Sequence, residues 1–311
     1  VSLMGVLSGI EIALWDILGK ALNKPIYELI GGRVHEKLRS YTYIYPDLAK
    51  KQDDSIYWNA EQSAERAAHY VKLGFTGIKF DPAAPYSSFD PRQPSLESME
   101  LCTRFCRLIR EAVGNKADLL FGTHGQFTAS GAIRFAKQIE PYNPLWFEEP
   151  TPPDRPEEMA LVARGTSIPV ATGERLTTKY EFGRVLELRA ASILQMALGR
   201  VGGIWEAKKI AGMAEVNYAQ IAPHLYAGPI EAAANIQYGT SLPNFLILES
   251  IETFGGFYAK LLKKPIRWEQ GYVIPPTEPG LGVELNEEVA LAHPYTGDRL
   301  HLEMTNHPVN V

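Results

Sequence analysis

The stretch "LWFEEPTPPDRPEEMALVARGTSIPVATGER", residues 145–175, contains one complete strand–helix–strand repeat. An apolar run at 145–148 is followed by a helical pattern at 155–165, and a second apolar run follows at 168–173. Strands that alternate with helices in this way are typical of a parallel sheet covered by helices. Glu148 ends the first run and Glu174 follows the second. Because the carboxyl ends of parallel strands meet at one edge, we expect the two carboxylates to converge.

The same repeat continues in both directions along the chain. Eight runs rich in β-branched, aromatic or other apolar residues are predicted to be strands, at 39–45, 77–80, 117–122, 145–148, 168–173, 191–197, 220–224 and 245–249. Positions 148, 174, 197, 224 and 249 follow one another at intervals of 26, 23, 27 and 25 residues. One βα unit per interval predicts a (β/α)₈ barrel with its site at the carboxyl ends of the strands. A doubly wound open sheet is the alternative, but no glycine-rich dinucleotide loop follows the first strand.

The two ends of the chain differ from the repeat in the middle. We expect residues 1–38 to form a helix and linker that lead into the barrel, and residues 39–265 to form the barrel itself. Residues 266–311 are rich in Pro and Gly in their first half and are predicted to return to a small α+β capping domain. The chain starts inside a helical pattern and without methionine, so the N-terminal half of that capping domain is expected to precede Val1.

Composition favours small-molecule chemistry. The 311 residues carry a net charge of −5 and contain no dense Lys/Arg block, so we expect neither a nucleic-acid partner nor a membrane partner. The only cysteines, Cys102 and Cys106, are one helical turn apart among apolar positions and are predicted to be buried as small hydrophobic residues. This scarcity of cysteine favours a reducing cytoplasm.

Four polar residues at predicted strand ends could carry chemistry. Paired carboxylates such as Glu148 and Glu174 suit Mg²⁺, although glutamates at such positions also occur as salt-bridged structural groups. His224 ends the seventh strand and is a candidate general base, because histidine titrates near neutral pH. Glu249 ends the eighth strand, where it could donate a hydrogen bond to a developing oxyanion or form an ion pair that closes the barrel.

Several motifs together resemble one known family: "LSGIEIALWDILGKALNKPIYELIGG", "GFTGIKFDP", "LWFEEP", "VATGER", "GRVGGIWEAKKIAGMAE", "PHLYAGPIEAAANIQ" and "EPGLGVELNEE". The chain is similar to the enolase superfamily, mandelate racemase subgroup, and within it to the sugar-acid dehydratases. The resemblance implies abstraction of the proton α to a carboxylate, with a divalent metal stabilising the enediolate. Loss of a β-hydroxyl then gives a 2-keto-3-deoxy sugar acid. It also implies a homo-oligomer, from a dimer to an octamer.

The resemblance also suggests roles for individual residues. Glu148 and Glu174 match the second and third metal ligands, and His224 matches the histidine base of the seventh strand. Lys79 is a candidate catalytic residue and matches the first lysine of a Lys-x-Lys pair whose second member is replaced here by Asp81. Glu249 matches the acid near the substrate carboxylate, so substrate contacts are expected from Lys79, Asp81 and Glu249.

Two positions depart from the family pattern. The third strand of the family ends Asp-x-His-Gly, whereas this chain has Gly122 in place of the metal ligand and keeps His124 as the catalytic acid. The sixth strand normally supplies an aspartate that orients the base histidine, and Ala197 stands there. Loss of that carboxylate is expected to lower the pKa of His224 and make it a weaker base.

A substitute metal ligand is one consequence that we expect of Gly122. Side chains alternate along a strand, so His124 is predicted to share the inward face of position 122 and could bind the metal itself. Imidazole suits Mn²⁺ or another transition metal better than Mg²⁺. Asp81 on the neighbouring strand is the other candidate.

The interpretation that the sequence favours is therefore a sugar-acid dehydratase in which His124 and His224 act as acid and base. A racemase or cycloisomerase of a sugar acid or lactone would use the same enediolate without losing water. A non-catalytic homologue that binds a sugar acid or a partner is the alternative from another class. Gly122 and Ala197 favour that alternative, and five retained polar residues oppose it: His124, Glu148, Glu174, His224 and Glu249.

Overall fold

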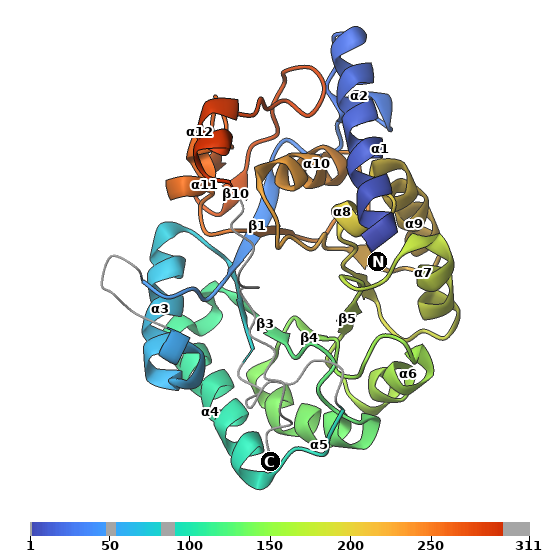
Figure 1. Cartoon of the computed structure of the whole chain (residues 1–311). Helices are drawn as coiled ribbons and strands as arrows, with labels where there is room; N and C mark the ends of the chain where they lie inside the picture. Colours follow the sequence, from blue (N-terminus) through green and yellow to red (C-terminus); the bar gives the residue numbers. More distant parts are fainter. Residues whose placement is uncertain (1, 48–53, 82–90, 295–311) are drawn as a thin grey trace. The chain divides into compact units, whose positions relative to one another are not determined.

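A computed structural model describes residues 2–47, 54–81 and 91–294 of the chain (Figure 1). The chain divides into two compact units. Among the described residues, unit 1 contains 2–41, Gly173–Gly183 and 194–294, and unit 2 contains 42–47, 54–81, 91–172 and Arg184–Ile193. Residues 295–311, which were predicted to complete the capping segment, lie outside the described residues.

Unit 2 is built on a parallel sheet. Its strands are the end of β1 (Leu38–Tyr43), β2 (Gly77–Phe80), β3 (Asp118–Gly122), β4 (Trp146–Glu148) and β5 (Val170–Thr172). These strands pair in chain order, each parallel to the next. The register aligns Gly122 with Glu148 and Phe80 with Phe121. The ends of β2, β3 and β4 therefore lie at the same edge of this sheet.

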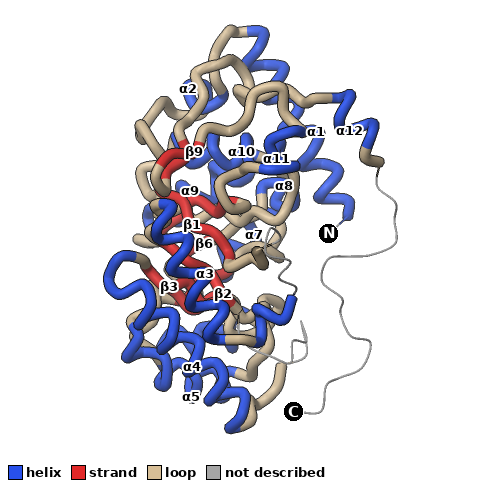
Figure 2. Tube along the Cα trace, turned by 90° about the vertical axis from the view of Figure 1, so that its left-hand side faces the viewer, coloured by secondary structure: helices blue, strands red, loops and turns tan. Residues whose placement is uncertain are grey.

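Helices cover the strands of unit 2. They are α3 (Ala60–Leu73), α4 (Leu96–Val113), α5 (Ala129–Ile139) and α6 (Pro156–Gly165), with short 3₁₀ turns η2 (Asp54–Trp58), η3 (Gly114–Lys116) and η4 (Glu140–Tyr142). Asn59, Ser95 and Thr128 begin α3, α4 and α5, where each side chain accepts a backbone N–H of the first turn. Figures 1 and 2 show α4 and α5 next to β3 in two directions.

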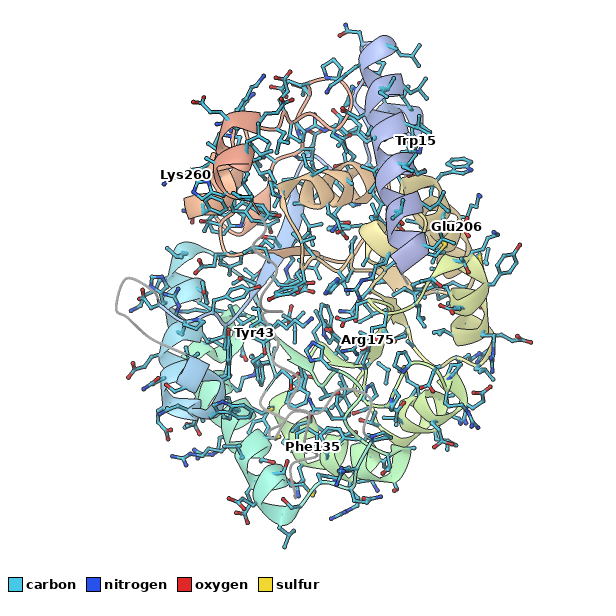
Figure 3. The ribbon with its side chains drawn as sticks, in the orientation of Figure 1. Trp15, Tyr43, Phe135, Arg175, Glu206 and Lys260 are labelled. Carbon is cyan, nitrogen blue, oxygen red and sulfur yellow. The ribbon has the colours of Figure 1, made fainter. Side chains whose placement is uncertain are left out.

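Aromatic rings form part of the core beneath these strands. Phe135 of α5 (Figure 3) lies with its ring centroid 5.2 Å from that of Phe121 in β3 and 6.0 Å from that of Phe147 in β4. All three side chains are fully buried. Burial of aromatic area at this level contributes strongly to holding a helix against a sheet. Cys102 and Cys106 are buried in α4, as predicted.

Unit 1 combines short strands with most of the remaining helices. The strands are β6 (Ile193–Leu194), β7 (Gln220–Ile221), β8 (Leu248–Ser250), β9 (Trp268–Glu269) and β10 (Tyr272–Val273). The first residue of β6 is the last residue of a unit 2 segment. The helices are α1 (Ser2–Ala21), α2 (Ile26–Leu29), α8 (Leu198–Val201), α9 (Ile204–Val216), α10 (Pro229–Thr240), α11 (Gly256–Lys260) and α12 (Glu287–Ala292). Helix α7 (Thr178–Glu187) begins in unit 1 and ends in unit 2. β10 pairs antiparallel with the start of β1 and with β9.

Helix α1 presents its polar side chains to the rest of unit 1. Glu11 accepts hydrogen bonds from the backbone N–H groups of Ile204 and Trp205, at 2.7 and 2.9 Å, where α9 begins. Ser8 accepts one from Gly202 N–H at 3.0 Å. Ile12 of α1 is buried, but seven other apolar side chains of this helix are exposed, namely Leu3, Val6, Leu7, Ile10, Leu14, Ile17 and Leu18. This distribution is the reverse of the usual amphipathic helix.

The α/β architecture predicted from the sequence is confirmed. Each of the eight predicted runs contains or overlaps a strand, and most of the strands are shorter than the runs that predicted them. The apolar patterns continue beyond the hydrogen-bonded ladders, which explains the difference in length. Within the described residues, no helix combines the length and the apolar character needed to cross a membrane.

Candidate active site

Unit 2 places a buried ion pair where β2 and β4 end. Lys79 Nζ lies 2.6 Å from Glu148 Oε1, and each side chain is only 3% exposed. The indole N–H of Trp146 donates to Glu148 Oε2 at 3.0 Å. Gly122, on the intervening strand β3, lacks the Cβ that would meet Lys79 Cε at 3.4 Å. Both oxygens of the Glu148 carboxylate are thus held by this chain's own side chains.

A second polar pair in unit 2 joins the segments that follow β2 and β3. His124 Nδ1 lies 2.5 Å from Asp81 Oδ2, and the Asp81 side chain is 3% exposed. The backbone of His124 has a φ of 51°, in the left-handed region. The strand alternation expected to continue from Gly122 to His124 is therefore wrong, because the extended backbone ends at Gly122.

Unit 1 holds the other histidine. His224 Nε2 lies 3.4 Å from Glu174 Oε2. The backbone N–H groups of Ala222 and His224 donate to Leu194 O and Met196 O, at 3.0 and 3.2 Å. In a parallel ladder this register places Ala197 alongside His224. The buried Nδ1 of His224 has no hydrogen-bond partner among the described residues. Ala197, which stands where the resemblance predicts an orienting aspartate, offers His224 no side-chain acceptor.

Other groups in unit 1 fix the two glutamates and the histidine backbone. Arg175 (Figure 3) has Nη2 at 3.6 Å from Glu174 Oε1. Arg200 Nη1 donates to the carbonyl of Glu174 at 3.2 Å. Glu249 Oε2 accepts the backbone N–H of Leu225 at 2.8 Å. Asn235, which lies in α10, donates from Nδ2 to the carbonyl of His224 at 3.0 Å.

The sequence interpretation missed several of these supporting groups. Arg175 directly follows Glu174 in "ATGER", so its proximity could have been noted. Trp146, Arg200 and Asn235 had no such signal, because each acts on a main-chain or side-chain atom that only the folded register brings within reach.

The donor chemistry of the predicted ligands suits a hard divalent cation. Glu148 in unit 2 and Glu174 in unit 1 are both buried carboxylates. Mg²⁺ is commonly held by one or two carboxylates together with waters and substrate oxygens. Over residues 2–47, 54–81 and 91–294 there is no group of three His, Cys, Asp or Glu residues that could hold a metal ion. Each unit therefore offers one buried carboxylate of the kind that a hard divalent cation accepts.

Each unit brings one imidazole next to one carboxylate, and an imidazole in such a pair is suited to act as a general acid or base. Comparisons with known proteins identify two family models that match this chain. Residues 62–289 match the family described as enolase C-terminal domain-like, and residues 2–31 match the mandelate racemase/muconate lactonizing enzyme N-terminal domain.

Three relatives illustrate the similarity. The chain is 34% identical to a D-xylonate dehydratase of Haloferax volcanii, with 96% of this chain and 71% of the relative covered. It is 35% identical to a D-galactonate dehydratase of Klebsiella pneumoniae, with 92% and 72% covered. It is also similar to the crystal structure of a mandelate racemase/muconate lactonizing enzyme-type protein from Labrenzia alexandrii DFL-11. The identity is 66% and the TM-score 0.93, over 97% of this chain and 76% of the other.

Proposed function

Because the chain belongs to the mandelate racemase/muconate lactonizing enzyme group of the enolase superfamily, we propose that it is a sugar-acid dehydratase. It is an enzyme of the hydro-lyase type, and its substrate is a small polyhydroxylated carboxylate. The observation that carries this function is the identity of 34% and 35% to two sugar-acid dehydratases over 96% and 92% of the chain. The product is a 2-keto-3-deoxy acid.

The proposed reaction moves one proton and expels one hydroxyl. A base removes the proton α to the carboxylate, and the bond from the β-carbon to its hydroxyl then breaks as an acid protonates the departing oxygen. We assign the base to His224, whose carbonyl is fixed by Asn235. His124 is the acid that delivers the second proton. Glu249, anchored by Leu225 N–H, lies beside the substrate carboxylate in this proposal.

The proposed metal ligands are Glu148 and Glu174, with His124 or Asp81 as the candidate that replaces the ligand absent at Gly122. Mg²⁺ is the first candidate and Mn²⁺ the second, because an imidazole ligand favours the transition metal. When bound, the cation would neutralise negative charge that develops on the substrate carboxylate. Lys79 supports this arrangement by its ion pair with Glu148 and contributes positive charge near the substrate. The Asp81 carboxylate is proposed to contact the substrate as a hydrogen-bond acceptor.

The proposal also includes the type of barrel and the boundaries of its domains. We propose an enolase-type (β/α)₈ barrel over residues 39–265, preceded by the helix and linker of residues 1–38 and followed by a return of residues 266–311 to a partial capping domain. Support comes from the eight strands and the two family matches. A cytoplasmic homo-oligomer is also proposed; the exposed apolar side chains of α1 suit a surface that is covered by other protein.

Proton NMR in D₂O tests the proposed function directly. The protein is incubated with a set of aldonic and aldaric acids that includes D-xylonate and D-galactonate, in Mg²⁺, in Mn²⁺ and after chelation. We expect metal-dependent loss of an α-proton signal together with the signals of a 2-keto-3-deoxy acid. Exchange of the α-proton with an inverted or cyclised product would identify an isomerase instead. No exchange by folded protein in either metal would identify a non-catalytic homologue.

A further inference from the structure

The two histidines of the proposed reaction differ in what holds their rings. His224 has no hydrogen-bond partner on Nδ1 among the described residues, and Ala197 lies alongside it in the strand register. His124 has Asp81 Oδ2 at 2.5 Å from its Nδ1. A carboxylate in contact with one ring nitrogen fixes both the orientation and the tautomer of a histidine. His224 has Glu174 Oε2 at 3.4 Å from its Nε2, whereas its Nδ1 has no hydrogen-bond partner among the described residues. The structure therefore places a carboxylate against Nδ1 at the other histidine from the one that the family pattern predicts.

Strand register explains why Asp81 can reach His124. Phe80 of β2 pairs with Phe121 of β3. Asp81 and Gly122 are the next residues along these two segments, so they lie at the same edge of the sheet. A Cβ at Gly122 would lie 3.8 Å from the Cβ of Asp81. An aspartate at position 122 would therefore bring a second negative charge against Asp81, which is unfavourable in a buried setting. Glycine at 122 leaves the Asp81 carboxylate beside the imidazole without this repulsion.

The loop that carries His124 is fixed by contacts outside the pair. The hydroxyl of Thr123 donates to the carbonyls of Glu148 and Glu149, at 2.9 and 2.8 Å. Gly125 N–H donates to the carbonyl of Glu149 at 2.7 Å. These flanking bonds hold His124 in its left-handed conformation, which a non-glycine residue adopts only when its surroundings over-determine it. The contacts of Thr123 and Gly125 therefore hold the His124 imidazole beside Asp81.

We propose that Asp81 and His124 form an orienting carboxylate–imidazole dyad, which replaces the dyad that His224 lacks. The inference rests on the proposed function. In this proposal Asp81 accepts the Nδ1–H of His124 at 2.5 Å, so Nε2 is the ring nitrogen left to transfer the proton. The Nε2–H bond breaks as the proton passes to the departing β-hydroxyl, which leaves as water. Asp81 is then a positioning residue and not a metal ligand.

The tautomer of His124 can be measured without any substrate. Long-range ¹H–¹⁵N NMR of the metal-free protein distinguishes the two neutral tautomers of its seven histidines, and the signals lost in His124→Gln identify His124. We expect the Nδ1–H tautomer in the unmodified protein, a changed tautomer in Asp81→Asn and its return in Asp81→Glu. An Nε2–H tautomer in the unmodified protein, or no change in Asp81→Asn, would overturn the dyad.

Kinetics and metal binding then distinguish a positioning role of Asp81 from a role as a metal ligand. Asp81→Asn is expected to lower kcat by about 10²- to 10⁴-fold, the usual contribution of a positioned acid or base, with little change in KM. Asp81→Glu should recover part of that loss, and the exposed Asp154→Asn should change nothing. The affinity for Mg²⁺, measured by calorimetry, should be retained in Asp81→Asn. Unchanged kcat, or lost Mg²⁺ affinity with an unchanged tautomer, would contradict the proposal.

Failure of the proposed function gives a different result from failure of the dyad. If the unmodified protein acts on no sugar acid, the dehydratase assignment fails and with it the catalytic role of the dyad. The NMR tautomer still decides whether Asp81 orients His124. If the protein is active but Asp81→Asn is equally active, only the dyad fails.

Discussion

At the scale of single residues, the charges at the ends of β2 and β4 are held by partners within unit 2. Lys79 and Glu148 are buried together, and the Trp146 indole donates to the same carboxylate. A buried ion pair gains stability only when both partners remain, because each charge alone has lost its hydration. Glu148 therefore has a structural role in addition to the metal-binding role proposed for it.

Replacing Glu148 by alanine tests that structural role. We expect Glu148→Ala to lower the free energy of unfolding by about 3–5 kcal/mol, since Lys79 loses the carboxylate it contacts in a buried site. Urea denaturation in the presence of a chelator measures this without a metal contribution. Glu111→Ala removes an exposed partner of Arg107 and should cost at most about 1 kcal/mol. Equal losses in the two variants would show that the buried pair has no special contribution.

At the scale of elements, two helix and strand termini depend on a carboxylate from elsewhere in the same unit. Glu11 of α1 accepts the N–H groups of Ile204 and Trp205 at the start of α9, where Gly203 provides no side-chain cap. Glu140 accepts Ser167 N–H at 2.8 Å and the Thr166 hydroxyl at 2.7 Å, where the chain passes from α6 towards β5.

The Glu11 cap predicts a loss of stability on truncation. Glu11→Ala leaves the first N–H groups of α9 without their acceptor and should lower the free energy of unfolding by about 0.5–2 kcal/mol. Chemical denaturation measures the change. Glu28→Ala, which removes an exposed partner of Lys24, is the matched control and should have a smaller effect. A loss no greater than that of the control would mean that water replaces the cap without cost.

Glu140 predicts a pH dependence. The hydrogen bond from Ser167 N–H, followed by that from Thr166, lowers the pKa of the Glu140 carboxyl in the folded protein. Its stabilising contribution is present above the unfolded pKa of about 4.3 and is lost as the pH falls through the lower folded value. Thermal melts of the unmodified protein and of Glu140→Gln should therefore differ at pH 7 and converge as the pH falls below the lowered folded pKa. A difference in melting temperature that does not change with pH would contradict this.

At the scale of the whole molecule, metal binding should be visible as stability. A ligand bound only by the native state raises the free energy of unfolding by about 2.7 kcal/mol at 100 times its Kd. We expect Mg²⁺ or Mn²⁺ to raise the melting temperature of the unmodified protein. Glu148→Gln and Glu174→Gln should each remove that rise, while Glu111→Gln should keep it. A rise that survives both substitutions would place the cation elsewhere on the chain.

Much of the fold could be predicted because its signals are local. Apolar runs, helical periodicity and turn residues specify each strand and helix within a few residues of chain, and all eight predicted strand runs coincide with strands. Strand-end positions also made candidates of His124, Glu148, Glu174, His224 and Glu249. Helix α1 was predicted equally well as a helix, but the direction of its polar face was not, because it depends on Glu11 meeting the N-terminus of α9.

The sequence by itself determined the residue types available for chemistry, the α/β repeat and the two departures at Gly122 and Ala197. Only the tertiary structure decided which groups meet. Lys79 pairs with Glu148 across 69 residues, and Asp81 with His124 across 43. The physical reason is that the periodicity of apolar residues depends only on residues close together in the sequence. Hydrogen-bond partners depend instead on strand register and on the left-handed turn at His124, which form only when the strands pair.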